Sequence, residues 1–377
     1  MSIIHKYIYL GIVVSTSIDK VLFLLSLTEL SVQFKRVIIK ANIAISGLLV
    51  LLKRYEMKKR KYIGVLISAF IGVLAIVGVY WNYKMVPSNE NQVKIGATYM
   101  TMNNDFYKVL NNEVEKIVEE NNDILYTRDP ALDVDKQTQQ VESFIEKGVN
   151  IIIINPVDAN SQKLIKALKK AKRAGIKIVV VDSQLSDDSS VDTTIVSDNY
   201  QAGVLCAQNL MQTQSSAKIL LLEHQNAVSA VDRINGFLDT IEGNDAYQVV
   251  DRKDCLGQTE IAMPQVESVI ASGVEFDTVM ALNDQVAIGA LAAIENSNVT
   301  TSIKIYGVDG SPDMKNLLAT TSSIQATVAQ SPLTIGKRAI QAGYSLYHNK
   351  SVDKEIVIPV EFMTNENVSD FDLAGWQ

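Results

Sequence analysis

From residue 93 onward the chain alternates short apolar runs with longer stretches in which apolar positions recur every three or four residues. The short runs predict buried β-strands and the periodic stretches predict amphipathic helices. The predicted strands are 93–97, 124–127, 149–154, 176–181, 193–196, 218–222, 249–251, 278–282, 303–308 and 324–328, and the predicted helices include 106–120, 135–147, 161–174, 200–211 and 332–347. This alternation favours parallel sheets covered by helices, and the number of units favours two similar α/β lobes.

Polar side chains stand where three of these strands end, at Asn283, Asp309 and Gln330. Open α/β sheets bind ligands in the crevice beyond the carboxyl ends of their strands. Carboxylates and amides repeated at such positions suit a ligand that is rich in hydroxyl groups.

The composition is that of a chain that can fold and that carries a net negative charge. The 377 residues are enough for two domains and an accessory segment, and they are 47% hydrophobic and 20% charged. The formal charge of -7 argues against nucleic acid as a partner, because proteins that bind phosphate backbones usually present a basic face.

An uncharged run covers residues 62–83 and follows a basic cluster at 58–61. As a helix, 22 residues extend about 33 Å, which is enough to cross the hydrocarbon core of a bilayer. The basic cluster should stay cytoplasmic, and Tyr80, Trp81 and Tyr83 suit the opposite interface. We therefore expect a single-pass protein of the cell membrane whose chain after residue 84 is extracytoplasmic.

A cleaved signal peptide is the alternative for this run. Its apolar region is normally about 7–15 residues long and ends in small residues, whereas residues 79–83 offer no such pattern, so we favour a retained anchor. The cysteines, Cys206 and Cys255, lie far downstream, so lipid modification is not expected, and a disulfide between them stays open.

Residues 1–56 are apolar in patches, but charged residues limit their uncharged runs to about a dozen residues, too few for a membrane span. Our hypothesis is that translation begins at Met57. The chain then divides into an atypical extension at 1–56, a basic flank, anchor and tether at 57–87, and a binding domain at 88–377.

Seven segments, taken in order, carry a resemblance to a known family: 102–107, 153–158, 181–183, 229–237, 282–285, 307–313 and 326–330. Through them residues 93–368 resemble the ribose-binding branch of the periplasmic sugar-binding proteins, which share their fold with LacI-like ligand domains. The resemblance implies the type I periplasmic-binding-protein fold, with two doubly wound parallel-sheet lobes joined by three crossovers near 197–199, 327–330 and 359–361. The first lobe would comprise about 93–197 and 330–359, and the second about 198–329 and 360–368.

The resemblance also assigns the sugar contacts, which fall on polar and aromatic side chains of both lobes: Asn104, Phe106, Tyr107, Asn155, Asp182, Arg233, Asn283, Asp309 and Gln330. Ser183 departs from the family because an arginine usually follows the strand-end aspartate, and Cys255 stands where a ring is usual. We include both positions in the predicted site and expect a larger, less cationic cavity than that of a ribose binder. Taken singly, several of these residues have structural explanations; Asn283, for example, suits a helix N-cap.

Chemistry independent of the resemblance also favours sugar binding. Carboxylates accept the proton of a sugar hydroxyl, arginine and amides donate to its oxygen, and Phe106 and Tyr107 can cover the apolar faces of a ring. Catalysis is not predicted, because the three histidines are scattered and the sequence has neither a nucleophile elbow nor metal-ligand spacing. His224 follows a predicted strand, but we expect it to be solvated or packed.

The sequence thus predicts a sugar-binding protein that is not an enzyme and has no cofactor or metal. One function is capture of a monosaccharide for the membrane permease of an ABC-type importer. The other is a tethered co-receptor whose closure on sugar is sensed by the ectodomain of a sensor kinase. The identity of the sugar and of the partner stays open.

Overall fold

The structure is a computed structural model that describes residues 71, 72, 74, 92–297, 299 and 301–377. The predicted anchor at 62–83 lies outside the described residues except at three positions, and the predicted extension at 1–56 and start at Met57 lie wholly outside them. Within the described part of the chain, no helix is both long and apolar enough to span a bilayer.

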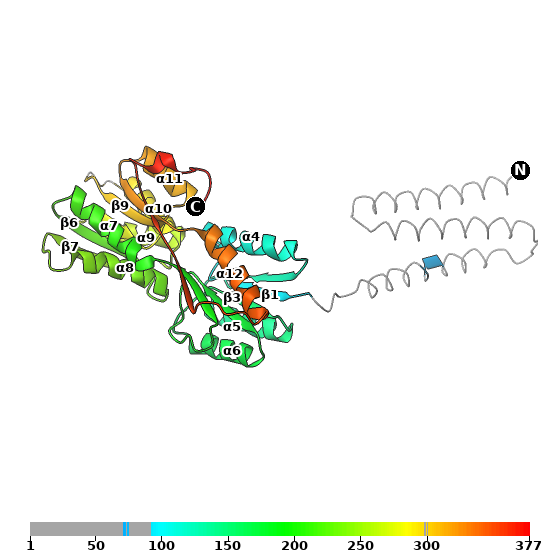
Figure 1. Ribbon diagram of the computed structural model, residues 1–377. Helices are drawn as coiled ribbons and strands as arrows, with labels where there is room; N and C mark the ends of the chain where they lie inside the picture. Colours follow the sequence, from blue (N-terminus) through cyan, green and yellow to red (C-terminus); the bar gives the residue numbers. More distant parts are fainter. Residues whose placement is uncertain (1–70, 73, 75–91, 298, 300) are drawn as a thin grey trace, which may run out of the picture. The chain divides into compact units, whose positions relative to one another are not determined.

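Strands and helices alternate along residues 92–377 (Figure 1). The strands are β1 (Lys94–Thr98), β2 (Ile124–Arg128), β3 (Ile151–Ile154), β4 (Lys177–Val181), β5 (Thr193–Ser197), β6 (Ala217–Glu223), β7 (Tyr247–Asp254), β8 (Thr278–Ala281), β9 (Lys304–Asp309), β10 (Ile324–Ala329), β11 (Glu355–Ile358) and β12 (Glu361–Thr364). The helices are α4 (Asp105–Glu120), α5 (Val134–Glu146), α6 (Gln162–Arg173), α7 (Asn199–Thr213), α8 (Val228–Ile241), α9 (Thr259–Ala271), α10 (Asp284–Glu295), α11 (Pro312–Thr320) and α12 (Pro332–Tyr347), with a 3-10 turn η1 (Val368–Asp370).

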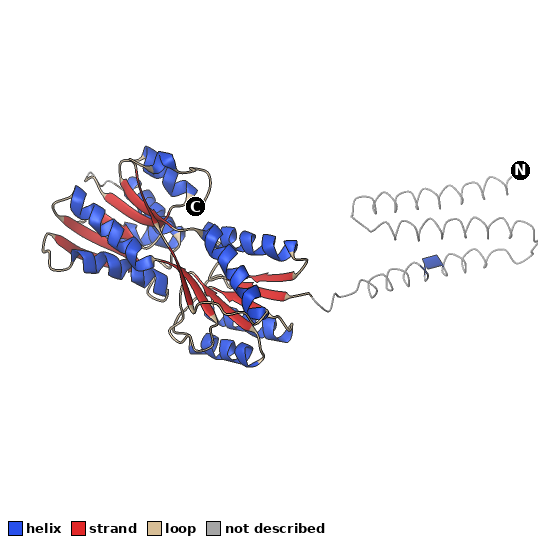
Figure 2. Cartoon of the chain, in the orientation of Figure 1, coloured by secondary structure: helices blue, strands red, loops and turns tan. Residues whose placement is uncertain are grey.

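These strands form two six-stranded sheets (Figure 2). The first sheet has the order β11-β5-β4-β3-β1-β2, and all of its pairs are parallel. The second has the order β12-β10-β9-β8-β6-β7, and it is parallel except where β12 runs antiparallel to β10. The predicted pair of α/β lobes is confirmed, with an antiparallel edge strand that the sequence did not predict.

The chain passes between the two sheets three times, after β5, after β10 and after β11. Helix α7 packs on α8 and β10 in the second lobe, whereas α12 returns to pack on α4, β3 and β4 in the first. The second passage is predicted near 327–330, and in the structure β10 ends at Ala329, so the chain leaves the second sheet at Gln330.

The central strand of the first lobe explains why its sequence is continuously apolar. Strand β3 lies between β4 and β1, and all four of its isoleucines are fully buried. A strand covered by helices on both faces has no solvent side, so it reads as an unbroken apolar run. Edge strands differ: β7 exposes Gln248 and Val249, and it is longer at both ends than the predicted 249–251.

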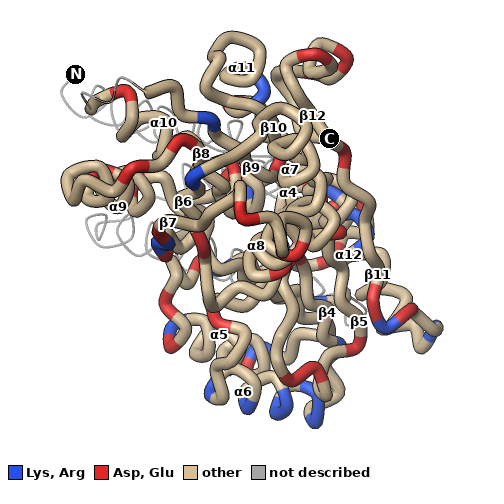
Figure 3. Tube along the Cα trace, turned by 90° about the vertical axis from the view of Figure 1, so that its left-hand side faces the viewer, with Lys and Arg blue, Asp and Glu red and all other residues tan. Residues whose placement is uncertain are grey.

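Basic side chains of the first lobe gather along α6 (Figure 3). Lys163 and Lys169 pair with Asp135 and Asp187 at 2.8 and 2.7 Å, but these ion pairs are exposed and screened by salt. Other charged side chains, among them Asp182, Arg233 and Asp309, are instead buried.

Candidate functional site

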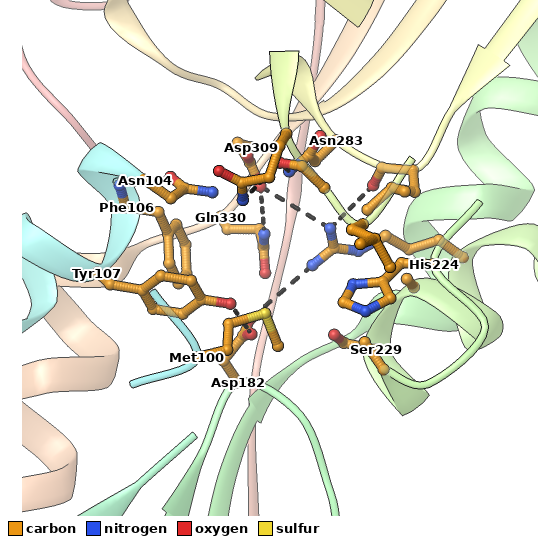
Figure 4. Close-up of a pocket in the computed structure, with 17 residues that line it drawn as sticks. Met100, Asn104, Phe106, Tyr107, Asp182, His224, Ser229, Asn283, Asp309 and Gln330 are labelled. Carbon is orange, nitrogen blue, oxygen red and sulfur yellow. Dashed lines mark hydrogen bonds and ion pairs between the residues drawn. The ribbon is translucent and has the colours of Figure 1, made fainter. Parts of the chain in front are cut away.

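A cavity lies between the two lobes, beyond the carboxyl ends of strands from both sheets (Figure 4). It encloses about 400 Å³ of space when its open mouth is included. The first lobe contributes Met100, Asn104, Phe106, Tyr107 and Asp182; the second contributes His224, Ala227, Ser229, Ala230, Arg233, Leu256, Gly257, Gln258, Leu282, Asn283 and Asp309; and Gln330 lies where the chain crosses back.

Strand ends bring the polar side chains to this cavity. Asp182 directly follows β4, Asp309 is the last residue of β9, and Gln330 directly follows β10. Asp182 and Asp309 have positive φ angles of 64° and 145°. Such angles cost a residue other than glycine about 1–3 kcal/mol, so the surrounding structure must hold both aspartates in place.

Asn283 combines a structural role with a place in the cavity wall. Its Oδ1 accepts a hydrogen bond from the Val286 backbone N–H at 3.0 Å and caps α10, while its Nδ2 donates to the Gly257 carbonyl at 3.2 Å. The N-cap interpretation is therefore correct, and it does not remove Asn283 from the cavity lining.

Arg233 is 4% exposed and projects from α8 between the acidic groups of both lobes. Its Nε donates to Asn199 Oδ1 at 2.8 Å, and its Nη1 donates to the Leu282 carbonyl at 2.9 Å. Asp182 and Asp309 lie 4.0 and 3.9 Å from the guanidinium, which is ion-pair range but beyond hydrogen-bond range. Two hydrogen bonds thus fix the guanidinium while it neutralises charge from both lobes.

Burial raises the pKa of both cavity carboxyls above the ordinary range. For Asp182, desolvation outweighs the opposing effects of Arg233 and of hydrogen bonds from Tyr107 and Asn155. For Asp309, desolvation and the nearby Asp284 carboxyl raise the pKa further. Burial likewise lowers the pKa of His224, so this imidazole is neutral at neutral pH.

Aromatic rings form the wall on the side of the first lobe. Phe106 and Tyr107 meet edge to face, with ring centroids 5.4 Å apart, and the Tyr107 hydroxyl donates to Asp182 Oδ2 at 3.0 Å. Burial and this bond raise the pKa of Tyr107, so it remains a neutral donor that orients the carboxylate.

The chain's last residues reach this wall from the other lobe. The ring of Trp376 lies edge-on to Phe106, with centroids 5.8 Å apart. The buried Lys315 of α11 holds this tail, since its Nζ donates to the carbonyl oxygens of Asp372 and, at 2.7 Å, of Gly375. Trp376 is thus fixed to the second lobe while it contacts a cavity residue of the first.

The lobes also touch directly. Asn103 Nδ2 donates to Glu260 Oε1 at 2.8 Å, and the backbone N–H of Ala159 donates to the Asn226 carbonyl at 3.1 Å. These contacts join the first lobe to the second on both sides of the cavity residues, so the structure represents a closed cleft.

Eight predicted residues line the cavity: Asn104, Phe106, Tyr107, Asp182, Arg233, Asn283, Asp309 and Gln330. The structure places the other three, Asn155, Ser183 and Cys255, outside that lining. Asn155 is fully buried behind the wall. Its Nδ2 donates a hydrogen bond to Asp182 Oδ2, and its Oδ1 accepts one from the Met100 backbone N–H. The Ser183 hydroxyl accepts the backbone N–H of Ser229 at 3.2 Å, an additional contact between the lobes.

Cys255 is packed in the apolar core of the second lobe, and Cys206 is a buried residue of α7. Both thiols are free, so the disulfide that the sequence left open is absent from the described structure. Burial raises the pKa of each thiol, to about 12 for Cys255, which makes both poor nucleophiles.

The cavity also has lining residues outside the predicted site, among them His224 and Gln258. His224 directly follows β6, and the strand-end rule indicates a place near the cleft, but a solvated or packed side chain was favoured. In the structure it is 4% exposed and lines the cavity. Gln258 comes from the loop after β7, where no comparable pattern marks it.

A profile of the periplasmic binding protein domain matches residues 95–351. The ribose import binding protein of Bacillus subtilis is 30% identical over 290 residues, covering 76% of this chain and 92% of that protein.

Solved structures agree with this sequence relationship. The binding protein of the arabinose ABC transporter of Shewanella, bound to L-arabinofuranose, has a TM-score of 0.67 and 28% identity over 74% of this chain and 94% of its own. A solute-binding protein of Mycobacterium smegmatis with bound glycerol has a TM-score of 0.71 and 26% identity, covering 76% and 98%. The chain belongs to the periplasmic binding protein family.

Proposed function

We propose that this protein is the extracytoplasmic binding protein of an ABC-type sugar importer, and that it encloses one monosaccharide between its lobes. The observation that carries the proposal is the cavity itself, where Asp182 of one lobe and Asp309 and Arg233 of the other face the same small volume. The sugar import binding protein and the sugar-bound solute-binding protein among its relatives support this class of ligand.

The chemistry of the lining fits a hydroxyl-rich ring. Carboxylate oxygens of Asp182 and Asp309 can accept hydroxyl protons, and amides such as Asn104 can donate to hydroxyl oxygens. Phe106 and Tyr107 offer apolar surface to the C–H face of the ring. Because the polar groups come from both lobes, a ligand that contacts all of them binds the closed form and shifts the population toward it.

Sugar binding is tested by a thermal-shift panel of pentoses, hexoses and related furanoses on residues 88–377. We expect a Kd of about 1 μM, or roughly −8 kcal/mol. At a thousandfold excess over Kd, a ligand that binds only the folded state stabilises it by about 4 kcal/mol, a rise in Tm of roughly 7 °C. If no sugar in the panel shifts Tm at millimolar concentration, the proposal fails.

Closure is expected to appear in the fluorescence of Trp376. The chain has two tryptophans, and Trp81 is absent from residues 88–377, so the tryptophan emission of this fragment, excited where tyrosine does not absorb, comes from Trp376 alone. Opening would separate Trp376 from Phe106 and expose its indole, so a saturating sugar should shift emission to shorter wavelength and increase it. An unchanged spectrum with a sugar that raises Tm would refute closure over this contact.

A second function rests on the uncharged run at 62–83 and its basic flank. An anchored binding protein stays at a high effective concentration near one membrane partner, which suits a co-receptor of a sensor kinase. Crosslinking of the native protein with ligand present separates the two functions. A permease among the products supports the importer, whereas a kinase ectodomain supports the co-receptor.

A further inference from the structure

The cavity and its wall hold more buried acid than base. Asp182, Asp284 and Asp309 are 4%, 0% and 4% exposed, and Arg233 is the one basic side chain among the residues that line the cavity, apart from the neutral His224. Three carboxylates against one guanidinium leave two negative charges if all are ionised. Buried charge of this size is costly unless a cation or a proton compensates it.

Hydrogen bonds within the described structure do not use all of the acceptors. Asp182 Oδ2 accepts from Tyr107 and Asn155, while Oδ1 has only the guanidinium at 4.0 Å. Asp309 Oδ1 accepts from Gln330 Nε2 at 2.7 Å, while Oδ2 has no donor in the described residues. Asp284 differs, since Thr327 and the Ser311 backbone satisfy it behind the wall.

Gln330 provides an independent indication that a donor is missing. Its side chain is 2% exposed and lines the cavity, and its Oε1 has no hydrogen-bond partner among the described residues. Figure 4 shows this amide between the two aspartates, with its nitrogen turned toward Asp309 and its oxygen turned away. A buried acceptor left empty costs about 1–3 kcal/mol, so a ligand that donates there binds more tightly.

Arg233 does not meet this need, because its Nη2 lies 4.0 Å from Asp182 Oδ1, beyond hydrogen-bond range. Its Nε and Nη1 are engaged by Asn199 and by the Leu282 carbonyl, and those bonds hold it at ion-pair distance from both aspartates. A primary ammonium has three donors, no acceptor and one positive charge, which matches the unused oxygens of Asp182, Asp309 and Gln330. A hydroxyl brings one donor and no charge.

We propose that the preferred ligand is an amino-substituted cyclic polyol, such as an amino sugar, whose ammonium group is bound by Asp182, Asp309 and Gln330. The proposal rests on the proposed sugar-binding function and specifies its ligand class. In the empty cleft protons occupy part of the acidic excess, because burial raises the pKa of Asp182 and Asp309 and holds that of Asp284 at about 6. The ammonium takes their place when the ligand binds.

The test is titration calorimetry on the full-length chain in detergent, with pairs that differ only in one group: D-glucosamine against D-glucose, D-galactosamine against D-galactose, and D-mannosamine against D-mannose. We expect at least one amine to bind tenfold or more tightly than its neutral counterpart. Its N-acetyl derivative, which lacks the charge, should lose that advantage. If the neutral sugar of each pair binds as well as its amine or better, the ammonium proposal is wrong and sugar binding stands. If no member of any pair binds and no sugar of the neutral panel binds, the ammonium proposal and the sugar-binding proposal are both wrong.

Two substitutions locate the charge. Asp309→Asn and Asp182→Asn keep the size of the side chain, come from different lobes, and should each lower the ratio of amine to neutral affinity about tenfold. The matched control is Asp313→Asn, an exposed aspartate on α11 of the second lobe, which should leave the ratio unchanged. A ratio that survives both cavity substitutions contradicts the proposal.

The pH dependence has a definite sign. The charged and titratable groups that face the ligand are Asp182, Asp309, Arg233, Tyr107 and His224, with Asp284 behind them. Ammonium binding requires ionised carboxylates. Because the pKa of these carboxyls is raised, they lose their protons only as pH rises, so affinity for an amine should rise about tenfold from about pH 5 to about pH 7. Affinity for an amine that falls over this range would overturn the assignment.

Discussion

Arg233→Ala should weaken binding of a neutral sugar in the cleft by about 2 kcal/mol or more, roughly a 30-fold rise in Kd. The guanidinium is buried, is fixed by Asn199 and Leu282, and lies within 4.0 Å of carboxylates from both lobes. Without it Asp182 and Asp309 lose their one cationic neighbour in the cavity, and closure brings two uncompensated carboxylates together. Calorimetry with a sugar found by the thermal-shift panel measures the effect.

The control for this substitution is Arg173→Ala, which removes an exposed arginine at the end of α6. It should bind like the wild type. Circular dichroism should show that Arg233→Ala is folded, because the lost side chain faces a cavity and not an apolar core. Binding by folded Arg233→Ala within threefold of the wild type would mean that the arginine takes no part in recognition.

Gly203→Ala should destabilise the fold by about 3 kcal/mol, lowering Tm by roughly 5 °C. A Cβ added at Gly203 would lie 1.8 Å from the Arg233 carbonyl oxygen and 2.7 Å from the Phe237 backbone nitrogen. Gly236 is the reciprocal case, with a Cβ placed 2.1 Å from the Tyr200 carbonyl oxygen. Because both obstacles are backbone, α7 and α8 must move apart, and α8 carries Arg233.

Helix propensity and the close helix contact predict opposite signs for the change in stability of Gly203→Ala. Helix propensity alone would make alanine more stable than glycine by about 1 kcal/mol inside α7. The matched control is Gln208→Ala on the exposed face of the same helix, where we expect a change within about 0.5 kcal/mol. Thermal unfolding measures the effect. A Gly203→Ala variant as stable as the wild type would show that the close contact between α7 and α8 does not determine the stability of this lobe.

Sequence predicts this fold best where burial is complete. Strand β3 and helix α12 were predicted from their apolar patterns, and the predicted bounds of α12 match the structure. Strands β11 and β12 were missed because each has only four residues and the two lie on either side of Pro359 and Val360, so neither is long enough to show a clear alternation. They matter because they form the third crossover between the lobes.

The site was predictable to the extent that strand ends converge. Asp182, Asp309 and Gln330 lie at the ends of strands, and ligands bind beyond the carboxyl ends of such strands, so their positions could be predicted. The direction in which each side chain points could not. Asn155 also follows a strand, yet its amide is used to hold Asp182 and the Met100 backbone. The contact of Trp376 with Phe106 joins residues far apart in sequence through a tail without regular structure, so no local pattern could predict it.

A crystal structure of residues 88–377 with a bound sugar is the most direct test of the central claim that the lobes enclose the ligand. We predict density in the cavity between Phe106 and Arg233. The ligand should lie within hydrogen-bond distance of Asp182 from the first lobe and of Asp309 or Asn283 from the second, with the lobes closed. A saturating sugar bound elsewhere, or held by one lobe alone in an open cleft, would contradict the account.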